Sequence, residues 1–183
     1  IRNVRAVYWK DVDSVAREIA LCDLMGTSVG KGALPFIMEP VARGLKARNP
    51  ECPLDIIIAE NIQNGAEFFV KELMKYLPED FDFGSRIGLI ETSIGKMVPI
   101  MTEEDLAKDR LWVFAEKYNT LILDKNGFKN PVPDIQGLAP KENIKAYVDR
   151  KLFIHNLGHA VCAYIGNISD PEYVYMQEVM GDK

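Results

Sequence analysis

The sequence has few of the features that mark proteins that bind nucleic acids or cross membranes. Its 183 residues carry a formal net charge of -5, and no run of Lys and Arg exceeds two residues. The chain therefore has no cluster of cations that could neutralise the phosphate backbone of a nucleic acid. The longest apolar stretches fall far short of the roughly 20 residues that span a bilayer, and no charged-then-apolar leader opens the chain. We therefore expect a cytoplasmic protein that binds neither nucleic acid nor membrane.

Cysteine is also scarce. The 3 cysteines, Cys22, Cys52 and Cys162, lie far apart, and no two have the spacing of metal ligands or of a redox pair. We expect reduced thiols. Cys22 and Cys162 stand in apolar sequence contexts, where cysteine typically behaves as a small hydrophobic core residue.

The remaining composition predicts a folded protein, because 48% of the residues are hydrophobic. That share suffices for one sizeable core. The first residue is Ile1 and not Met, and a β-rich run over residues 4–9 follows almost at once. We interpret this start as a sign that an upstream part is missing or was removed.

Short β-rich runs alternate with amphipathic helical stretches in the first half, which predicts a parallel sheet with helices on its faces. Asp11 should cap the first helix, and Pro35 fits the first turn of the second, where a missing N–H costs nothing. The expected helices are residues 11–20, 33–48 and 66–76. The expected strands are residues 4–9, 21–29, 54–60 and 86–91, with two short pieces within residues 112–123.

A proline-rich connector follows this sheet. Pro131, Pro133 and Pro140 exclude a regular helix there, so we place a domain boundary at this point. A long helix is predicted from Lys141 to about residue 165, with Gly166 as its stop. The fold class is therefore α/β, with half of a nucleotide-binding sheet in residues 1–130 and the start of a helical domain in residues 131–183.

The long helix contains both histidines of the chain, His155 and His159, close to Lys151 and Asn156. At about 100° per residue, Lys151, His155, His159 and Asn156 fall at about 0°, 40°, 80° and 140°, so they share one side. An amphipathic helix with a solvated polar face is the ordinary alternative. However, the face lacks the usual mixture of Glu and Lys, and Gly158 costs helix stability of about 1 kcal/mol. A ligand that approaches closely would explain Gly158.

Two histidines four residues apart also raise the possibility of a zinc-dependent hydrolase. In the zinc-peptidase pattern a Glu follows the first His, whereas Asn156 follows it here, and no third ligand is evident. We expect no metal. A lysine among apolar residues suits proton transfer to a carbonyl or hydroxyl oxygen, and an amide donor such as Asn156 can stabilise negative charge on that oxygen. With His159 binding a neighbouring hydroxyl, these roles fit carbonyl reduction.

The spacing of Lys151, Asn156 and His159 resembles the signature of the polyol-specific long-chain dehydrogenases, the mannitol dehydrogenase family. The flanking run 149–166 and the segment Pro-Asp-Ile-Gln-Gly at 133–137 are similar to that family as well. The resemblance implies that residues 1–130 are the C-terminal part of a Rossmann-like doubly wound sheet. Residues 131–183 would then begin an all-helical substrate domain.

The same resemblance implies a site. Lys151 would exchange a proton with the substrate oxygen while hydride passes between the substrate carbon and NAD, without a metal. The turn at residues 60–65 resembles the family's turn after a strand, whose matching asparagine joins the oxyanion hole, and we carry that role to Asn61. The expected cofactor-binding residues are Thr27, Val29, Gly30 and Asn61. For the turn that contains Gly30, a simple chain reversal is the alternative.

The expected substrate is a small polyol or sugar phosphate, with mannitol 1-phosphate and fructose 6-phosphate as the leading pair. Lys96 and His155 are candidates for binding it, and a solvated surface lysine is the alternative for Lys96. The sequence also departs from the family: it has no G-x-G-x-x-G turn, and residues 95–96 are Gly-Lys where the family commonly has Asp-Arg. An inactive or non-catalytic fragment of such an enzyme is therefore the second hypothesis.

Overall fold

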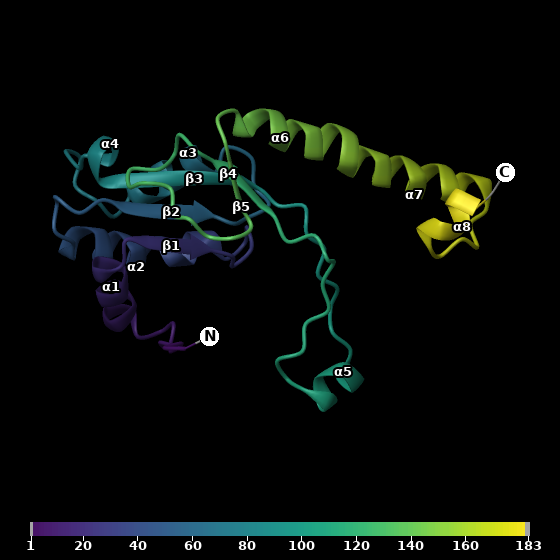
Figure 1. Ribbon diagram of the computed structural model, residues 1–183, viewed down its shortest axis with the longest axis horizontal. Coiled ribbons are helices and arrows are strands. Elements are labelled where there is room, and N and C mark those ends of the chain that lie inside the picture. The colour runs from purple at the N-terminus through teal and green to yellow at the C-terminus, as the bar shows by residue number, and fades with distance from the viewer. Residues whose placement is uncertain (1, 182–183) are drawn as a thin grey trace. The chain divides into compact units, whose positions relative to one another are not determined.

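The computed structural model describes residues 2–181 and contains one five-stranded sheet in the order β1-β2-β3-β4-β5 (Figure 1). β1, β2 and β3 are parallel, β4 is antiparallel to β3, and β5 is parallel to β4. The strands are β1 (Leu24–Thr27), β2 (Leu54–Ile58), β3 (Ile87–Ser93), β4 (Leu121–Asp124) and β5 (Leu138–Lys141). The mostly parallel sheet confirms the α/β fold class.

The expected helices of the first half are present. The side chain of Asp11 caps α1 by accepting the backbone N–H of Ser14 at 3.1 Å, and Pro35 stands in the first turn of α2. Hydrogen bonds from the hydroxyl and the backbone N–H of Ser14 lower the pKa of Asp11. The helices are α1 (Val12–Leu21), α2 (Leu34–Ala47), α3 (Gly65–Leu73), α4 (Phe83–Arg86), α5 (Glu103–Lys108), α6 (Ile144–Arg150), the π-helical η1 (Lys151–Asn156), α7 (Leu157–Ser169) and α8 (Met176–Gly181).

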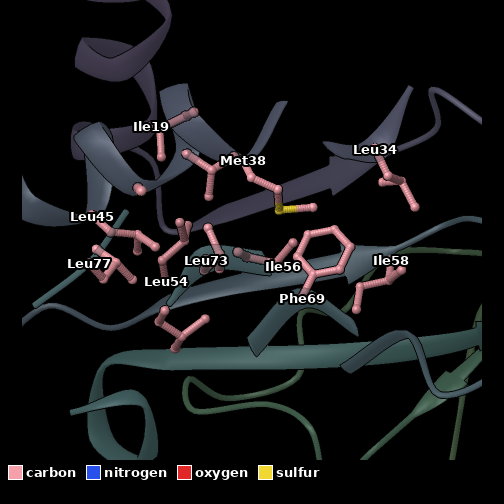
Figure 2. Close-up of a cluster of buried hydrophobic side chains, with 13 residues drawn as sticks. Ile19, Leu34, Met38, Leu45, Leu54, Ile56, Ile58, Phe69, Leu73 and Leu77 are labelled. Carbon is pink, nitrogen blue, oxygen red and sulfur yellow. The ribbon is translucent and has the colours of Figure 1, made fainter. Parts of the chain in front are cut away.

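The core forms on both faces of β2, whose five residues are all buried. Successive strand side chains point to opposite faces. Leu54, Ile56 and Ile58 pack with side chains of α2 and α3, such as Met38 and Phe69 (Figure 2). On the other face Ile57 packs with Ile90 of β3 and Leu123 of β4. Burial on both faces is typical of a central parallel strand.

Cys22 belongs to this core, as its apolar context predicts. Its side chain is partly buried against the core side chains of α1, α2, β2 and α3, and this burial raises the pKa of its thiol. A raised pKa lowers the fraction of reactive thiolate at neutral pH. Cys22 is therefore a packing residue.

A buried carboxylate anchors the loop after β4 to the middle of the sheet. Asp55 of β2 is 2% exposed, and its side chain accepts the backbone N–H groups of Lys129 and Asn130 at 2.8 and 3.1 Å. The side-chain amide of Asn130 donates to it at 3.1 Å. A buried charge is tolerated where such donors satisfy it, so Asp55 has a structural role.

Two predicted strands are absent from the described residues. Residues 4–9 are irregular, and Val4, Tyr8 and Trp9 are 78%, 64% and 69% exposed. Strand preference reflects packing against neighbours, so a β-rich run without a partner strand stays irregular. In residues 112–123 only the end of the segment forms a strand, β4.

The connector with three prolines is only partly irregular. Residues 131–137 contain no helix, as expected, but Pro140 lies within β5 at the edge of the sheet. Proline is tolerated there because an edge strand leaves one row of N–H groups unpaired. The contacts divide the chain into one compact unit through Ile144 and a second from Lys145, later than the expected boundary. The division into functional domains stays a prediction.

Gly166 does not end the long helix, so that prediction was wrong. α7 continues to Ser169, and a Cβ at Gly166 would lie 2.4 Å from the Cγ2 atom of Val179 in α8. The missing side chain thus allows two helices to pack closely. None of the helices among residues 2–181 combines the length and the hydropathy needed to cross a bilayer.

Two helical glycines should respond in opposite directions to alanine. At Gly44 in α2 a Cβ would lie 2.6 Å from side-chain atoms of Ile19, whereas at Gly158 no atom lies within 4 Å of it apart from its chain neighbours and the backbone of its own helix. Overpacking costs about 1–3 kcal/mol, and Ala favours a helix over Gly by about 1 kcal/mol. We expect Gly44→Ala to lower the free energy of unfolding and Gly158→Ala to raise it, as measured by urea denaturation. Equal effects would contradict this description of the helix packing.

Candidate active site

The carboxyl ends of β1 and β2 form the edge at which ligands of open α/β sheets bind. The strand register places Thr27 beside Ile58, and the N–H of Ala59 donates to the carbonyl of Thr27 at 3.0 Å. The turn after β1 and the turn after β2 therefore leave the sheet side by side. These turns contain the expected cofactor residues.

Glu60 joins the two turns. Its side chain is buried, and its two carboxylate oxygens accept the backbone N–H groups of Val29 and Gly30 at 2.7 and 2.9 Å. Gly30 has a φ of +83°, which favours glycine because it has no Cβ. The carbonyl of Gly30 then accepts the N–H of Ala33 at 2.9 Å, just before α2. These features show that Gly30 forms a turn held by Glu60, and its contact with the cofactor stays a prediction.

Thr27 has a buried hydroxyl without a partner. The residue is 3% exposed, and within the part of the chain that the structure describes its Oγ1 has no hydrogen bond. Thr27 and Val29 line a cavity of about 620 Å³, whose other walls are mostly apolar side chains from α1 and α2. An unpaired buried hydroxyl costs about 1–3 kcal/mol, so it calls for an explanation such as a bound ligand. Both features fit a nicotinamide cofactor.

Asn61 follows Glu60 directly and is exposed at the same edge. The neighbouring strand β3 contributes Glu91, whose carboxylate accepts the N–H of Ala66 at 3.0 Å at the start of α3. Glu60, which follows β2, and Glu91, which lies within β3, thus hold different backbone segments. Glu60 holds the turn expected to contact the cofactor, and Glu91 holds a helix.

Lys151 and Asn156 begin and end the π-helical turn η1 between α6 and α7. The N–H of Leu157 donates to the carbonyl of Leu152, a bond that spans five residues. Bonds of this span mark a π-helix, which has more residues per turn than an α-helix. Asn156 is therefore nearer to Lys151 around the helix axis than the 140° of a regular α-helix, so the prediction of a regular α-helix was wrong here. Both residues are partly buried.

The two histidines lie next to each other on this helix and are exposed. Their ring centroids are 4.5 Å apart at an interplanar angle of 60°. Protein zinc sites use at least three protein ligands. Among residues 2–181 no group of three or more His, Cys, Asp and Glu side chains could hold a metal ion.

Lys96 lies in the segment after β3, and its Nζ donates to Oδ1 of Asn119 at 2.9 Å. This bond accounts for one of its three donors. The role of Lys96 in substrate binding stays a prediction.

The structure thus brings the expected residues together in two groups, one in each compact unit. The first group, at the sheet edge, is Thr27, Val29, Gly30 and Asn61. The second group, on consecutive turns of one helix, is Lys151, His155, Asn156 and His159. Glu60 was not predicted from the sequence. The available signal was an acidic residue directly after an apolar strand.

The parallel strands and the ligand edge define a Rossmann-type nucleotide-binding domain. Residues 1–137 match the family model described as the mannitol dehydrogenase Rossmann domain. The chain belongs to the mannitol dehydrogenase family, as its lysine motif predicts. It is 34% identical over 164 residues to mannitol-1-phosphate 5-dehydrogenase from Lactiplantibacillus plantarum, a match that covers 87% of this chain and 42% of the relative. The chain therefore spans about two fifths of the length of that curated relative.

Proposed function

We propose that the complete gene product is an NAD-dependent polyol dehydrogenase that interconverts mannitol 1-phosphate and fructose 6-phosphate. The main support is the 34% identity, over 87% of this chain, to an enzyme named for that substrate. The free cysteines fit a cytoplasmic location, where thiols stay reduced. The substrates are small molecules, and no metal is required.

The proposed reaction divides its work among residues of both groups. When bound, NAD supplies the acceptor for the hydride that leaves the substrate carbon. Lys151, with Nζ unprotonated, takes the proton of the substrate hydroxyl, and in the reverse direction its ammonium returns that proton to the ketone oxygen. The amide group of Asn156 donates to the same oxygen, where negative charge grows, and the family resemblance gives Asn61 the same donor role. The turn η1 supports these roles because a π-helical turn brings Asn156 nearer to the side of the helix that carries Lys151 than a regular α-helix would.

The remaining roles concern substrate orientation. His159 binds a hydroxyl next to the reacting carbon. His155, whose ring lies 4.5 Å from that of His159, is our candidate for binding another hydroxyl of the substrate. Lys96 is our candidate for the phosphate of the substrate, because a lysine ammonium binds phosphate as a point charge. At the sheet edge, Thr27 and Val29 contact the cofactor from the cavity that they line.

The unpartnered hydroxyl of Thr27 predicts that its removal will preserve or raise stability but weaken NADH binding. Thr27→Val keeps the shape of the side chain but removes the hydroxyl that is buried without a hydrogen bond. We expect the protein without cofactor to melt at the same or a higher temperature. The Kd for NADH should rise by about two- to tenfold, the equivalent of one lost hydrogen bond. A lower melting temperature with unchanged NADH affinity would show that the hydroxyl serves the fold.

Binding of NADH also separates the proposal from the non-catalytic alternative. Addition of NADH to the complete gene product should quench the tryptophan fluorescence of the protein, and the quenching should saturate. A protein that shows no saturable binding would support the non-catalytic hypothesis.

A further inference from the structure

We infer that Glu60 is a positioning residue that fixes the Val29–Gly30 turn for the cofactor and, through its own backbone, Asn61 for the substrate oxygen. The inference rests on the proposed function, and it assigns a role to a side chain outside the lysine motif. It starts from the two hydrogen bonds of 2.7 and 2.9 Å between this carboxylate and consecutive backbone N–H groups.

The carboxylate is well suited to hold a turn. Glu60 is 4% exposed, so water does not compete strongly for its oxygens. Each oxygen accepts one N–H, and hydrogen bonds to an ionised acceptor are stronger than neutral ones. The contact joins positions 30 and 31 residues apart in the chain. One side chain therefore sets the distance between the turn after β1 and the turn after β2, which are far apart in the sequence.

The same bonds limit what the turn can bind. Consecutive backbone N–H groups in a turn form an anion-binding concavity. Here the concavity already holds the carboxylate of Glu60, so the N–H groups of Val29 and Gly30 do not bind a cofactor phosphate. The contribution of this turn to the cofactor must come from its side chains and from Thr27, whose buried hydroxyl has no partner among the described residues.

The position of Glu60 links this turn to the reaction. Its neighbour in the chain is Asn61, the proposed oxyanion donor at the same sheet edge. A shift of the Glu60 side chain would move the cofactor turn relative to the backbone that carries Asn61. Misplacement of reacting groups by about 1 Å can cost about 10²-fold in rate.

Three variants of the complete gene product test the inference. Glu60→Gln replaces one acceptor oxygen by an N–H donor, so it can no longer accept the two backbone N–H groups on separate oxygens. Glu60→Asp keeps both oxygens on a shorter side chain. Glu91→Gln is the matched control, because Glu91 also accepts a backbone N–H at this edge but holds Ala66 at the start of α3. The readouts are hydrogen exchange of the Val29 and Gly30 amides without cofactor, the Kd for NADH, and kcat/KM.

We expect Glu60→Gln to speed exchange at both amides, to raise the Kd for NADH about tenfold and to lower kcat/KM about 10- to 100-fold. Glu60→Asp should fall between Glu60→Gln and the unchanged protein. Glu91→Gln should leave the exchange at these amides unchanged, with kinetics within about twofold. If Glu60→Gln does not fold, faster exchange at both amides together with a higher Kd for NADH in a folded Glu60→Asp still supports the inference.

Faster exchange with unchanged Kd and kcat/KM in folded Glu60→Gln would overturn the inference and leave Glu60 a purely structural residue. Unchanged exchange would overturn it as well, because the two hydrogen bonds would then not hold the turn. A gene product that binds NADH but turns over no polyol would contradict the proposed function alone, since the Kd would still test Glu60. A gene product that binds no NADH would overturn both.

Discussion

Lys151→Ala in the complete gene product is expected to lower kcat by about 10²- to 10⁴-fold, the range contributed by a positioned general acid or base. Lys151 begins the turn η1 and is only partly buried, so its loss leaves no large cavity. We therefore expect the melting temperature to change little. The rate loss should appear in both directions, because the same group takes the proton from the alcohol and returns it to the ketone.

Lys145→Ala is the matched control, because Lys145 is an exposed lysine one element earlier, in α6. It should keep kcat within about twofold, as is usual for a surface substitution. If Lys151→Ala loses its cooperative melt, Lys151 is a structural residue and the catalytic assignment is wrong. Equal rate losses in the two variants would also contradict a specific proton transfer at Lys151.

Asn156→Ala should lower kcat by about 10²- to 10³-fold, the usual loss for one oxyanion donor. The π-helical turn brings Asn156 nearer to the side of the helix that carries Lys151, which favours contact of the amide and the amine with the same substrate oxygen. The KM should change less than kcat, because the negative charge on that oxygen is largest in the transition state. Steady-state kinetics with the sugar phosphate and NADH measure both parameters.

Asn167→Ala provides the comparison, since Asn167 is an exposed asparagine further along the same helical segment, in α7. It should leave kcat unchanged within about twofold. A loss below about tenfold for Asn156→Ala would argue against an oxyanion role. In that case Asn61 would be the remaining amide candidate for the substrate oxygen.

The elements that the sequence predicts well depend on local signals. α1 follows from its Asp11 cap, α2 from Pro35 in its first turn, and β2 from an apolar run of the right length. The direction of β4 and the existence of β5 depend on which distant strand each one meets. No local pattern encodes that choice, so the antiparallel pair β3–β4 and the proline-containing edge strand appeared only in the structure.

The wrong predictions have related causes. The run at residues 4–9 has the composition of a strand, but composition does not supply a partner to pair with. Gly166 has the appearance of a helix stop, whereas its real environment is set by Val179 of α8. In both cases the deciding contact is absent from the local sequence.

Some residues of the candidate site could likewise be predicted from the sequence, and others could not. Lys151, Asn156 and His159 were recognised from their spacing and from a family resemblance, but the assumption of about 100° per residue hid the π-helical turn. The contact of Glu60 with Val29 and Gly30 crosses two strands, so spacing could not reveal it. The missing partner of the Thr27 hydroxyl is likewise a property of the packed structure.

The most direct measurement is NADH oxidation by the complete gene product, with fructose 6-phosphate and free fructose supplied side by side and Lys151→Ala as the control. We predict turnover with the phosphate, little with the free sugar, and a loss of about 10²-fold or more in the variant. Turnover with neither sugar would contradict the proposed substrate pair. Turnover that survives in Lys151→Ala would contradict the proposed mechanism.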